Sequence, residues 1–444
     1  MTQTVKESAL VALSREGVEA FSRRRGEPDW LRAARLAAWE RFEARQKPTS
    51  RDESWRRTDL SGLDLDRLAA PAEGSTAGRS AGLDAVIGQS GAEANLLVIR
   101  NGELAERRLD ERLGQRGVLL MDLAEAARER PELIQPYLAA ERSRPNESKL
   151  TALAQALWQD GALLYVPRGV VFADPIQIVH WSDGEGSSLF YTLLVADEAA
   201  SVTVVDAYGS PEDRPESLSS GIVDVVVRQA ARVGYLNLQE RDEQTWHFAS
   251  MVADQDRDSA LTWLTLMLGG RLSRTDLACE LRGQGAEADL FGLVFGEQDQ
   301  HFDLQSFQEH IGSDTRSDLV QKVALRDRSS SNFTGMIRVG LKALRTASNQ
   351  ESRNLLLDPG ARADADPKLE ILNSDVNRCG HGAAVGPVDE ELIFYLMTRG
   401  LSHDEAERLI VEGFFNPLLD QVPLEAVRER LWAAIHRKLG AASA

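Results

Sequence analysis

The chain has 444 residues, of which 69 are Asp or Glu and 51 are Lys or Arg, so its formal net charge is −18. This acidity disfavours nucleic acid and anionic membranes as principal partners, because both attract clustered Lys and Arg. No run approaches the roughly 18 apolar residues of a membrane helix, and residues 1–17 lack the apolar core of a secretory signal. With only two cysteines, the chain is expected to be cytoplasmic and free of structural disulfides.

Residues 1–160 are predicted to form a helical N-terminal domain. Apolar residues recur at spacings of three and four along residues 28–46, and Pro28 stands where helices often begin. Helical spacing returns between residues 121 and 159. Between these segments, residues 70–92 are rich in Gly, Ala and Ser and are predicted to form a loop or linker.

Residues 161–386 change to the period of β-strands. Short alternating runs follow one another, separated by Gly, Asp, Ser and Asn, with almost no helical spacing between them. Pairs of small residues precede the runs at intervals of about thirty residues, at 199–200, 230–231, 259–260 and 285–286. Such a repeat favours a β-solenoid, in which each coil packs only on its neighbours. A β-sandwich is the alternative, because strand spacing does not separate the two folds.

Residues 387–444 are predicted to form a C-terminal domain of three short helices. Gly400 marks the end of the first helix, the capping sequence at residues 402–405 opens the second, and Pro417 closes it. The third helix is predicted over residues 423–439. Three short amphipathic helices bury little surface alone, so they must pack on the β-region or on another protein.

Cys379 and His381 form the most chemically suggestive motif, within a stretch that contains three nearby glycines. In an extended segment, side chains two positions apart lie on the same face. Thiolate and imidazole are both good ligands for soft and borderline metals. Two ligands do not complete a zinc site, which needs four, so the spacing alone also fits packing and turn geometry.

Cys279 and two histidines have simpler interpretations. Cys279 shares its strand parity with Leu277 and Leu281, so it is predicted to face the core as a small apolar residue. His301 and His310 stand at positions of opposite parity in an alternating region, and we predict capping or core roles for them rather than metal ligation.

Carbohydrate-cleaving and nucleotide-binding functions are disfavoured by the sequence. Several aspartates of the β-region could suggest the paired carboxylates of a glycoside hydrolase, but most are predicted at turns, where Asp forms local hydrogen bonds. No Gly-x-x-x-x-Gly-Lys-Ser/Thr motif occurs, so this chain is expected to bind no nucleotide, and any ATP must be brought by another subunit. The aspartates concerned are Asp206, Asp254, Asp256, Asp258 and Asp289.

Residues 366–400, DPKLEILNSDVNRCGHGAAVGPVDEELIFYLMTRG, closely resemble the C-terminal signature of the SufB/SufD family of iron–sulfur cluster assembly proteins. Residues 333–339 (FTGMIRV) and 350–357 (QESRNLLL) resemble the same family. Residues 30–44 (WLRAARLAAWERFEA) and 53–60 (ESWRRTDL) are similar to the N-terminal domain of its SufD branch. These segments span most of the chain, and the C-terminal signature is highly specific.

The resemblance implies a right-handed parallel β-helix core between helical terminal domains. It also implies a non-catalytic scaffold subunit that pairs with SufB through the β-helix core and binds the SufC ATPase through its C-terminal helices. A nascent iron–sulfur cluster would be transient and shared at the subunit interface. The subunit would also take part in iron acquisition. His381 matches a residue thought to ligate metal there, and Cys379 matches a cysteine beside it. A homodimer of this chain is a further option.

Two positions favour the SufD branch over the SufB branch. Ser352 stands where SufB has a cluster-linked cysteine, and Gly382 stands where SufB has a glutamate. Cys279, however, resembles the sulfur-accepting cysteine of SufB, which makes it a possible sulfur-handling residue. The sequence around Cys379, Asn-Arg-Cys-Gly, departs from the more usual Val-Lys-Cys-Ser, which makes His381 the firmer of the two expected ligands.

The number of cysteines also bears on where a cluster would be held. Four-thiolate ligation is the common arrangement in iron–sulfur proteins, whereas this chain has two cysteines far apart in sequence. A cluster site is therefore expected to be shared with a partner. The alternatives are a purely structural stabiliser of SufB without cluster contact, and a SufB-like scaffold that forms a cluster as a homodimer.

Overall fold

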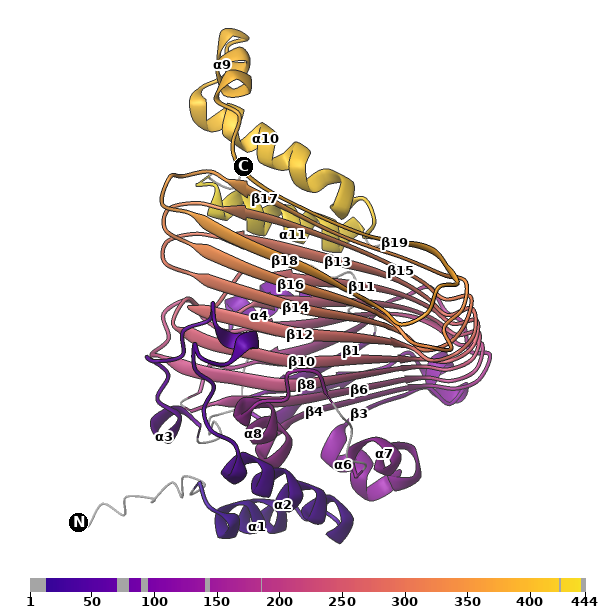
Figure 1. Ribbon diagram of the computed structural model, residues 1–444. Coiled ribbons are helices and arrows are strands. Elements are labelled where there is room, and N and C mark those ends of the chain that lie inside the picture. The colour runs from indigo at the N-terminus through magenta and orange to yellow at the C-terminus, as the bar shows by residue number, and fades with distance from the viewer. Residues whose placement is uncertain are drawn as a thin grey trace, which may run out of the picture.

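The computed structural model describes residues 13–69, 80–88, 95–139, 144–184, 186–422 and 425–440. Its strands stack into a parallel β-solenoid, with helices before and after it along the chain (Figure 1). From β4 (Asp160–Val166) onward, successive strands alternate between a nine-stranded and a ten-stranded sheet that enclose the core. Within the described residues, no helix is long and apolar enough to cross a membrane.

The strands of both sheets follow one another in spatial order along the stack. The ten-stranded sheet consists of β2 (Glu103–Arg108), β1 (Leu96–Arg100), β5 (Ile176–Trp181), β7 (Ser201–Gly209), β9 (Arg232–Glu240), β11 (Ala260–Met267), β13 (Glu287–Gly296), β15 (Arg316–Leu325), β17 (Thr346–Leu356) and β19 (Val376–Pro387). The nine-stranded sheet consists of β3 (Leu119–Asp122), β4 (Asp160–Val166), β6 (Ser188–Ala196), β8 (Ser217–Val227), β10 (Thr245–Gln255), β12 (Leu272–Leu281), β14 (His301–His310), β16 (Ser330–Val339) and β18 (Arg362–Ile371).

Parallel pairing between each strand and the next but one along the chain builds the solenoid. Leu272 of β12 pairs with His301 of β14, which pairs with Ser330 of β16, so one coil advances 29 residues. Among the described strand pairs, only β1–β2 and β3–β4 are antiparallel, and both lie at the start of the stack. These parallel ladders exclude the β-sandwich alternative, whose neighbouring strands run antiparallel.

Left-handed residues form a column of tight turns along one corner of the solenoid. Ala199 and Ala230 have φ angles of 58° and 57°. Their N–H groups donate to the carbonyls of Gln229 and Arg257 in the next coil, each at 2.9 Å. The alanine that follows each of them is buried. Three of the four recurring pairs of small residues are therefore turn residues whose second member is small because it enters the core. At the fourth pair, 259–260, the turn lies one residue earlier, with Asp258 left-handed and Ser259 buried.

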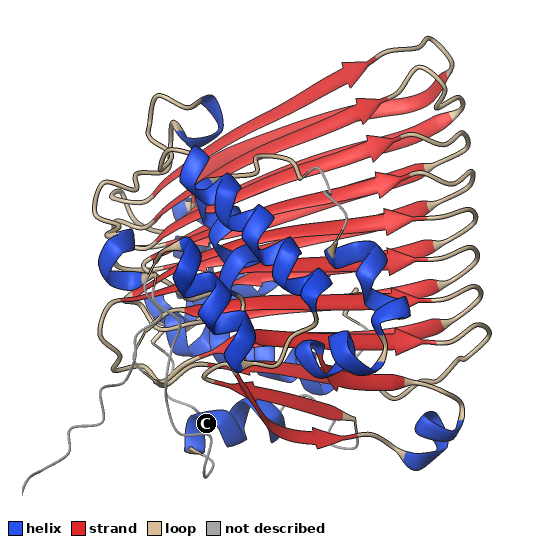
Figure 2. Ribbon diagram, turned by 90° about the horizontal axis from the view of Figure 1, so that it is seen from below, coloured by secondary structure: helices blue, strands red, loops and turns tan. Residues whose placement is uncertain are grey.

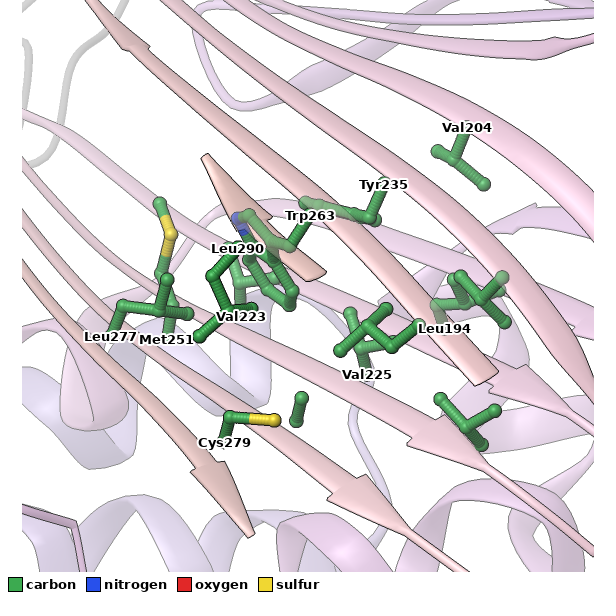
Figure 3. Packing of buried hydrophobic residues seen from close by; sticks show 14 of the residues in the cluster. Leu194, Val204, Val223, Val225, Tyr235, Met251, Trp263, Leu277, Cys279 and Leu290 are labelled. Carbon is green, nitrogen blue, oxygen red and sulfur yellow. The ribbon is translucent and has the colours of Figure 1, made fainter. Parts of the chain in front are cut away.

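Alternate residues of the strands point inward and form one continuous apolar core between the sheets. Cys279 belongs to this core and is fully buried, as the strand parity predicts. Figure 3 shows it among buried side chains that include Leu277, Met251 and Val225. Stacking coils bury these residues against both neighbours, so the core continues along the solenoid.

Helices cover the start of the stack (Figure 2). The second of them, α2, lies within the predicted residues 28–46 and begins after Pro28. The helices before β4 are α1 (Arg15–Arg24), α2 (Asp29–Ala44), the 3₁₀ turn η1 (Glu53–Trp55), α3 (Leu65–Leu68), α4 (Ala81–Gly88), α5 (Glu111–Gln115), α6 (Leu123–Glu129), α7 (Pro131–Leu138) and α8 (Lys149–Leu157).

Two features of the N-terminal region differ from the sequence predictions. β1, β2 and β3 fall within the first 160 residues, where the pattern predicts only helices; the apolar run of β1 is short and pairs with β5. Helix α4 occupies part of the predicted 70–92 loop, because Leu83 and Ile87, one helical turn apart, bury against Trp181. Residues 70–79 and 89–92 lie outside the described part of the chain.

The C-terminal helices are α9 (Glu390–Thr398), α10 (His403–Leu419) and α11 (Glu425–Lys438). Ser402 and Glu405 form the predicted capping box of α10. The predicted stop at Pro417 is wrong, because α10 continues through it to bury Leu418 and Leu419. Helices α10 and α11 pack on the outer face of the ten-stranded sheet, whereas α9 projects beyond the stack (Figure 1).

Candidate functional site

Strand β19 places Cys379 and His381 at the end of the ten-stranded sheet. Cys379 pairs with Ser348 of β17, and His381 pairs with Gln350 of the same strand. In the described part of the chain, β17 is the only strand of the sheet that pairs with β19, so one edge of β19 is free. Residues two apart on a strand share a face, so the thiol and the imidazole lie on the same side.

That side is the interior of the solenoid. Going back through the stack, His381 follows Gln350, Leu319 and Leu290 in register, and both leucines belong to the core. His381 ends this row. Its side chain is exposed, because no further coil covers it.

The last coil of the solenoid is open on its interior side. Leu369 and Ile371 of β18 continue inward rows of the core, yet they are 37% and 44% exposed. Val385 of β19 also lies on an inward row and is 45% exposed. This end, which we call the open end, therefore exposes apolar side chains beside a thiol and an imidazole, those of Cys379 and His381.

Cys379 is half-buried, with a polar contact on one side and an apolar one on the other. The hydroxyl of Ser348 donates to Cys379 Sγ at 3.3 Å. Ile337, Val339 and Ala343 form the small apolar cluster against which Cys379 packs. Cys379 is thus held in place while its sulfur stays near the surface.

The core becomes polar in the last three coils before the open end. Gln308 is fully buried one coil after Cys279, and neither its amide oxygen nor its nitrogen has a partner among the described residues. Asn354 Nδ2 donates to Ser352 Oγ, and that hydroxyl donates to Gln321 Oε1, each at 3.1 Å. We call this set the polar interior. Its members are Ser306, Gln308, Gln321, Gln350, Ser352 and Asn354.

Sequence inspection alone did not single out the polar interior as part of the site. Its signal is present in the strand parity: Phe302 and Leu304 are apolar at inward positions of β14, and Ser306 and Gln308 follow at the same parity. Buried polar groups are costly unless they are satisfied, so their concentration beside the Cys379 thiol and the His381 imidazole distinguishes this end from the rest of the core.

Cys279 is not brought to the open end. Its row continues through Gln308 to Ile337, and strands are spaced by about 4.8 Å, so two coils, or about 10 Å, separate Cys279 from Ile337. Burial raises the pKa of the Cys279 thiol well above its usual value, and the nearby carboxylates of Glu280 and Asp254 raise it further. Its Sγ donates to Gln255 Oε1 at 3.0 Å. In this closed conformation, the thiol is shielded and uncharged.

The two histidines at the ends of β14 are engaged with hydroxyl groups. His310 contacts Thr315 Oγ1 through Nδ1 at 2.7 Å and Ser317 Oγ through Nε2 at 2.8 Å. Burial lowers its pKa to about 4, so it is neutral at physiological pH. His301 Nδ1 contacts Ser330 Oγ at 2.8 Å. The structure places neither histidine beside Cys379 or His381.

The prediction that most of the five aspartates lie at turns is wrong, because Asp254 lies in β10, Asp289 in β13 and Asp206 in β7. Asp206 is fully buried. Its carboxylate accepts hydrogen bonds from the hydroxyls of Tyr208 and Tyr235. His180 Nε2 lies 3.4 Å from its other oxygen. The contacts explain a buried acid without invoking hydrolysis. They depend on neighbouring strands that the local sequence does not reveal.

No group of three or more His, Cys, Asp or Glu residues suited to a metal ion occurs within the described ranges. Cys379 and His381 supply one sulfur and one nitrogen donor, which suit iron. Tetrahedral iron in a cluster needs further ligands. The arrangement therefore fits half of a shared site and does not fit a complete one.

A second exposed apolar surface lies on α9. Its members are exposed by 42% to 68%, whereas Ile393 on the same helix is buried. Asp389 caps the helix, and Glu390 and Glu391 follow in its first turn. This surface, which we call the α9 patch, consists of Leu392, Phe394, Tyr395 and Met397. It combines apolar side chains with adjacent negative charge.

Two family models match the chain. The model described as "SUF system FeS cluster assembly, SufBD core domain" matches residues 180–414. The model described as "SufBD protein N-terminal region" matches residues 90–178. Together they cover the strands of the solenoid, the open end and most of the helix α10.

Curated relatives cover nearly the same span. The chain is 31% identical over 436 residues to iron–sulfur cluster assembly protein SufD of Bacillus subtilis, covering 97% of this chain and 98% of the relative. It is 28% identical over 427 residues to SufB of the same organism, with 93% and 90% covered. A SufBD family protein of Staphylococcus epidermidis is 30% identical over 324 residues, with 73% and 69% covered.

Proposed function

Because the chain belongs to the SufB/SufD family of iron–sulfur cluster assembly proteins, we propose that it is the SufD-type scaffold subunit of a SufB–SufC–SufD complex. In this role it helps to build nascent clusters and to acquire iron, and it catalyses no reaction of its own. The complex works in the cytoplasm, and the cluster is cargo that leaves the site once formed.

The observation that carries this proposal is the pairing of Cys379 and His381 at the open end. Both lie on the interior face of β19, and the free strand edge leaves that face accessible to another protein. We propose that His381 ligates iron and that Cys379 assists it. SufB would supply the remaining ligands, since two donors do not complete a cluster site.

The open end is the proposed docking surface for SufB. Its apolar residues Leu369, Ile371 and Val385 would lose their solvent exposure when a second solenoid abuts the last coil. Burial of apolar area drives such association, and the polar interior behind it would then lie next to the cluster. A second copy of this chain could occupy the same surface when SufB is absent, which makes a homodimer the competing assembly.

We propose that residues 387–444 dock the SufC ATPase through the α9 patch. Helices α10 and α11 are already packed on the sheet, whereas the patch is free within the described chain. Phe394 is 68% exposed, which is the largest exposed fraction among the four residues of the α9 patch. Phe394→Asp should abolish co-purification of SufC while SufB still binds. This variant is preferable to deleting the helices, because deletion would also expose the outer face of the ten-stranded sheet.

The proposed sulfur-handling role of Cys279 depends on one condition. Its burial and raised pKa oppose nucleophilic attack in the closed solenoid, so sulfur transfer would require the coils to open. Mass spectrometry after incubation with a cysteine desulfurase tests this directly. A mass gain of 32 Da on Cys279 (one sulfur atom, about 32 Da) would support sulfur handling, and an unmodified Cys279 beside an active desulfurase would exclude it.

Anaerobic cluster reconstitution tests the proposed role of His381. His381→Ala should leave the three-protein complex assembled and lower the cluster yield, read from visible absorbance and bound iron. His403→Ala is the matched control, because His403 is also exposed but lies on α10. A normal yield from the His381 variant would favour the alternative of a structural stabiliser without cluster contact.

A further inference from the structure

We propose that the outer face of the nine-stranded sheet carries a binding pocket for a small organic anion with a flat apolar part. The pocket uses none of the residues of the open end and goes beyond the proposed function. It forms where the segment between α2 and α3, residues 46–64, crosses the sheet (Figure 1, indigo). We call this segment the strap. The cavity beneath it has a volume of about 340 Å³.

The strap is anchored, so the pocket wall is already in place. The Arg274 guanidinium stacks on the Trp55 ring, 3.8 Å from its centroid, and donates to the Ser54 carbonyl at 2.7 Å. Thr58 Oγ1 donates to Asp303 Oδ2 at 2.5 Å, and Arg274 pairs with the same carboxylate at 2.6 Å. Arg274 and Asp303 are fully buried. A preformed wall removes part of the ordering cost of binding.

Three cations and two carboxylates line the cavity. Lys368 of β18 pairs with Glu53 of the strap at 3.3 Å and with Asp366 at 3.4 Å. Arg57 donates to Asn332 Oδ1 at 3.4 Å and pairs with the Asp364 carboxylate at 3.6 Å. Arg56 lines the pocket and has no hydrogen bond or ion pair within the described residues. With Asp364 beside Arg57, three carboxylates balance the three cations, and Arg56 is the cation without a carboxylate partner within the described residues.

The floor of the pocket combines apolar and polar groups. Phe307 of β14 and Met336 of β16 are register neighbours, half-buried, and form the apolar part. Thr334 lies two residues before Met336 on the same outward face of β16, and its hydroxyl also lines the pocket. A pleated sheet face of this kind suits a flat ring laid against Phe307 and Met336.

These features define the chemistry of the ligand. A guanidinium without a partner recognises a carboxylate or phosphate through charge-assisted hydrogen bonds. The apolar floor recognises a ring or other flat apolar group, and the cavity size is that of a small molecule. An inorganic anion would leave the Phe307 and Met336 surface unused, and a neutral ring would leave Arg56 unused. The geometry points to a ligand that carries both parts.

Calorimetric titration of the full chain with 2-naphthoate tests the proposal. Saturable binding of one molecule per chain is expected. The neutral 2-naphthalenemethanol and the ringless acetate should each bind at least about tenfold more weakly, because each lacks one half of the recognition. Arg56→Ala should weaken 2-naphthoate binding by about tenfold. Arg51→Ala, on the same strap but outside the pocket lining, is the matched control and should bind normally.

Thr334→Trp supplies a second test by filling the cavity, and binding should be lost while the unfolding midpoint stays unchanged. If the Trp variant does not fold, the comparison of Arg56→Ala with Arg51→Ala still tests the pocket. Both arginines are exposed, so neither substitution should prevent folding. Absence of saturable binding would overturn the proposal. So would equal affinities in the two arginine variants, which would place the probe elsewhere, for example on the α9 patch.

Discussion

The two ends of the solenoid are built from the same kind of coil, but one end is covered by other elements and the other is not. At the first coils, the inward residues Leu97, Ile99 and Leu164 are fully buried, and antiparallel strands and helices cover them. At the last coil, the inward residues Leu369 and Ile371 are 37% and 44% exposed. Strands β18 and β19 also leave one edge each unpaired within the described chain.

This difference suits the covered first end to stability and the uncovered last end to binding another chain. A covered end adds buried apolar area, whereas an uncovered end leaves strand edges that tend to pair with other chains. Alternating charges on the outward face of β18, such as Asp366, Lys368 and Glu370, make uncontrolled edge pairing less favourable. The open end is therefore suited to a specific partner, and the proposed cluster donors lie there.

The largest expected contrast comes from the same truncation at each end. Leu164→Ala removes a fully buried side chain and should lower the free energy of unfolding by about 2–5 kcal/mol. Leu369→Ala, at the open end, should cost about 1 kcal/mol because much of its side chain already contacts water. Urea unfolding followed by circular dichroism measures both. Equal losses would remove the distinction between the ends.

A second contrast concerns pH. Burial lowers the pKa of His310 to about 4, below its value of about 6.5 in an unfolded chain. The folded state therefore favours the neutral ring. This contribution is complete above pH about 6.5 and is lost as the pH falls through about 4, reaching about 3 kcal/mol in total.

His310→Gln should consequently flatten the fall in unfolding free energy between pH 6.5 and pH 4, a window set by the two pKa values. Urea unfolding at a series of pH values gives the two curves for comparison. Curves that run parallel for wild type and variant would show that His310 does not titrate as its buried position implies. The row of His310 leads to Ile371, so the test reports on the interior just behind the open end.

The two thiols should differ in reactivity. Cys379 is half-buried near the surface, whereas Cys279 is fully buried with a raised pKa. Iodoacetamide should alkylate Cys379 at least about 100-fold faster in the native protein. Peptide mass spectrometry over time gives both rates, and Cys379→Ser should leave almost no early labelling. Similar rates for the two thiols would mean that the solenoid opens often.

The smallest expected effect is on the stability of the open end itself. His381→Ala should change the free energy of unfolding by no more than about 0.5 kcal/mol, because exposed side chains contribute little. Thermal and urea unfolding of the isolated chain measure this change. A loss of several kcal/mol would mean that His381 has a structural role. A lowered cluster yield from His381→Ala would then no longer show that His381 ligates iron.

Much of the fold follows from local patterns. The helical spacing of residues 28–46 and the capping box at Ser402 and Glu405 correctly predict helices. The pairs of small residues correctly predict the solenoid repeat. Helix α4 escapes prediction because its order depends on contact with Trp181, which lies far away in sequence. The same reason applies to the helix that continues through Pro417.

The site follows from the sequence only in part. Strand parity predicts that Cys379 and His381 share a face, and it predicts that Cys279 points into the core. It does not reveal that the interior of the last coil is uncovered, because that depends on which strand ends each sheet. Nor does it reveal that Gln308 is buried without a partner among the described residues, which depends on side chains of other coils.

The central claim is that the open end supplies ligands to a cluster completed by a partner. Mössbauer spectroscopy of the ⁵⁷Fe-reconstituted complex with SufB and SufC tests it most directly. The wild-type complex should show one iron subsite whose isomer shift reports a nitrogen ligand, and His381→Ala should lose that subsite. Identical spectra from the wild-type and His381→Ala complexes, at equal iron content, would contradict the account.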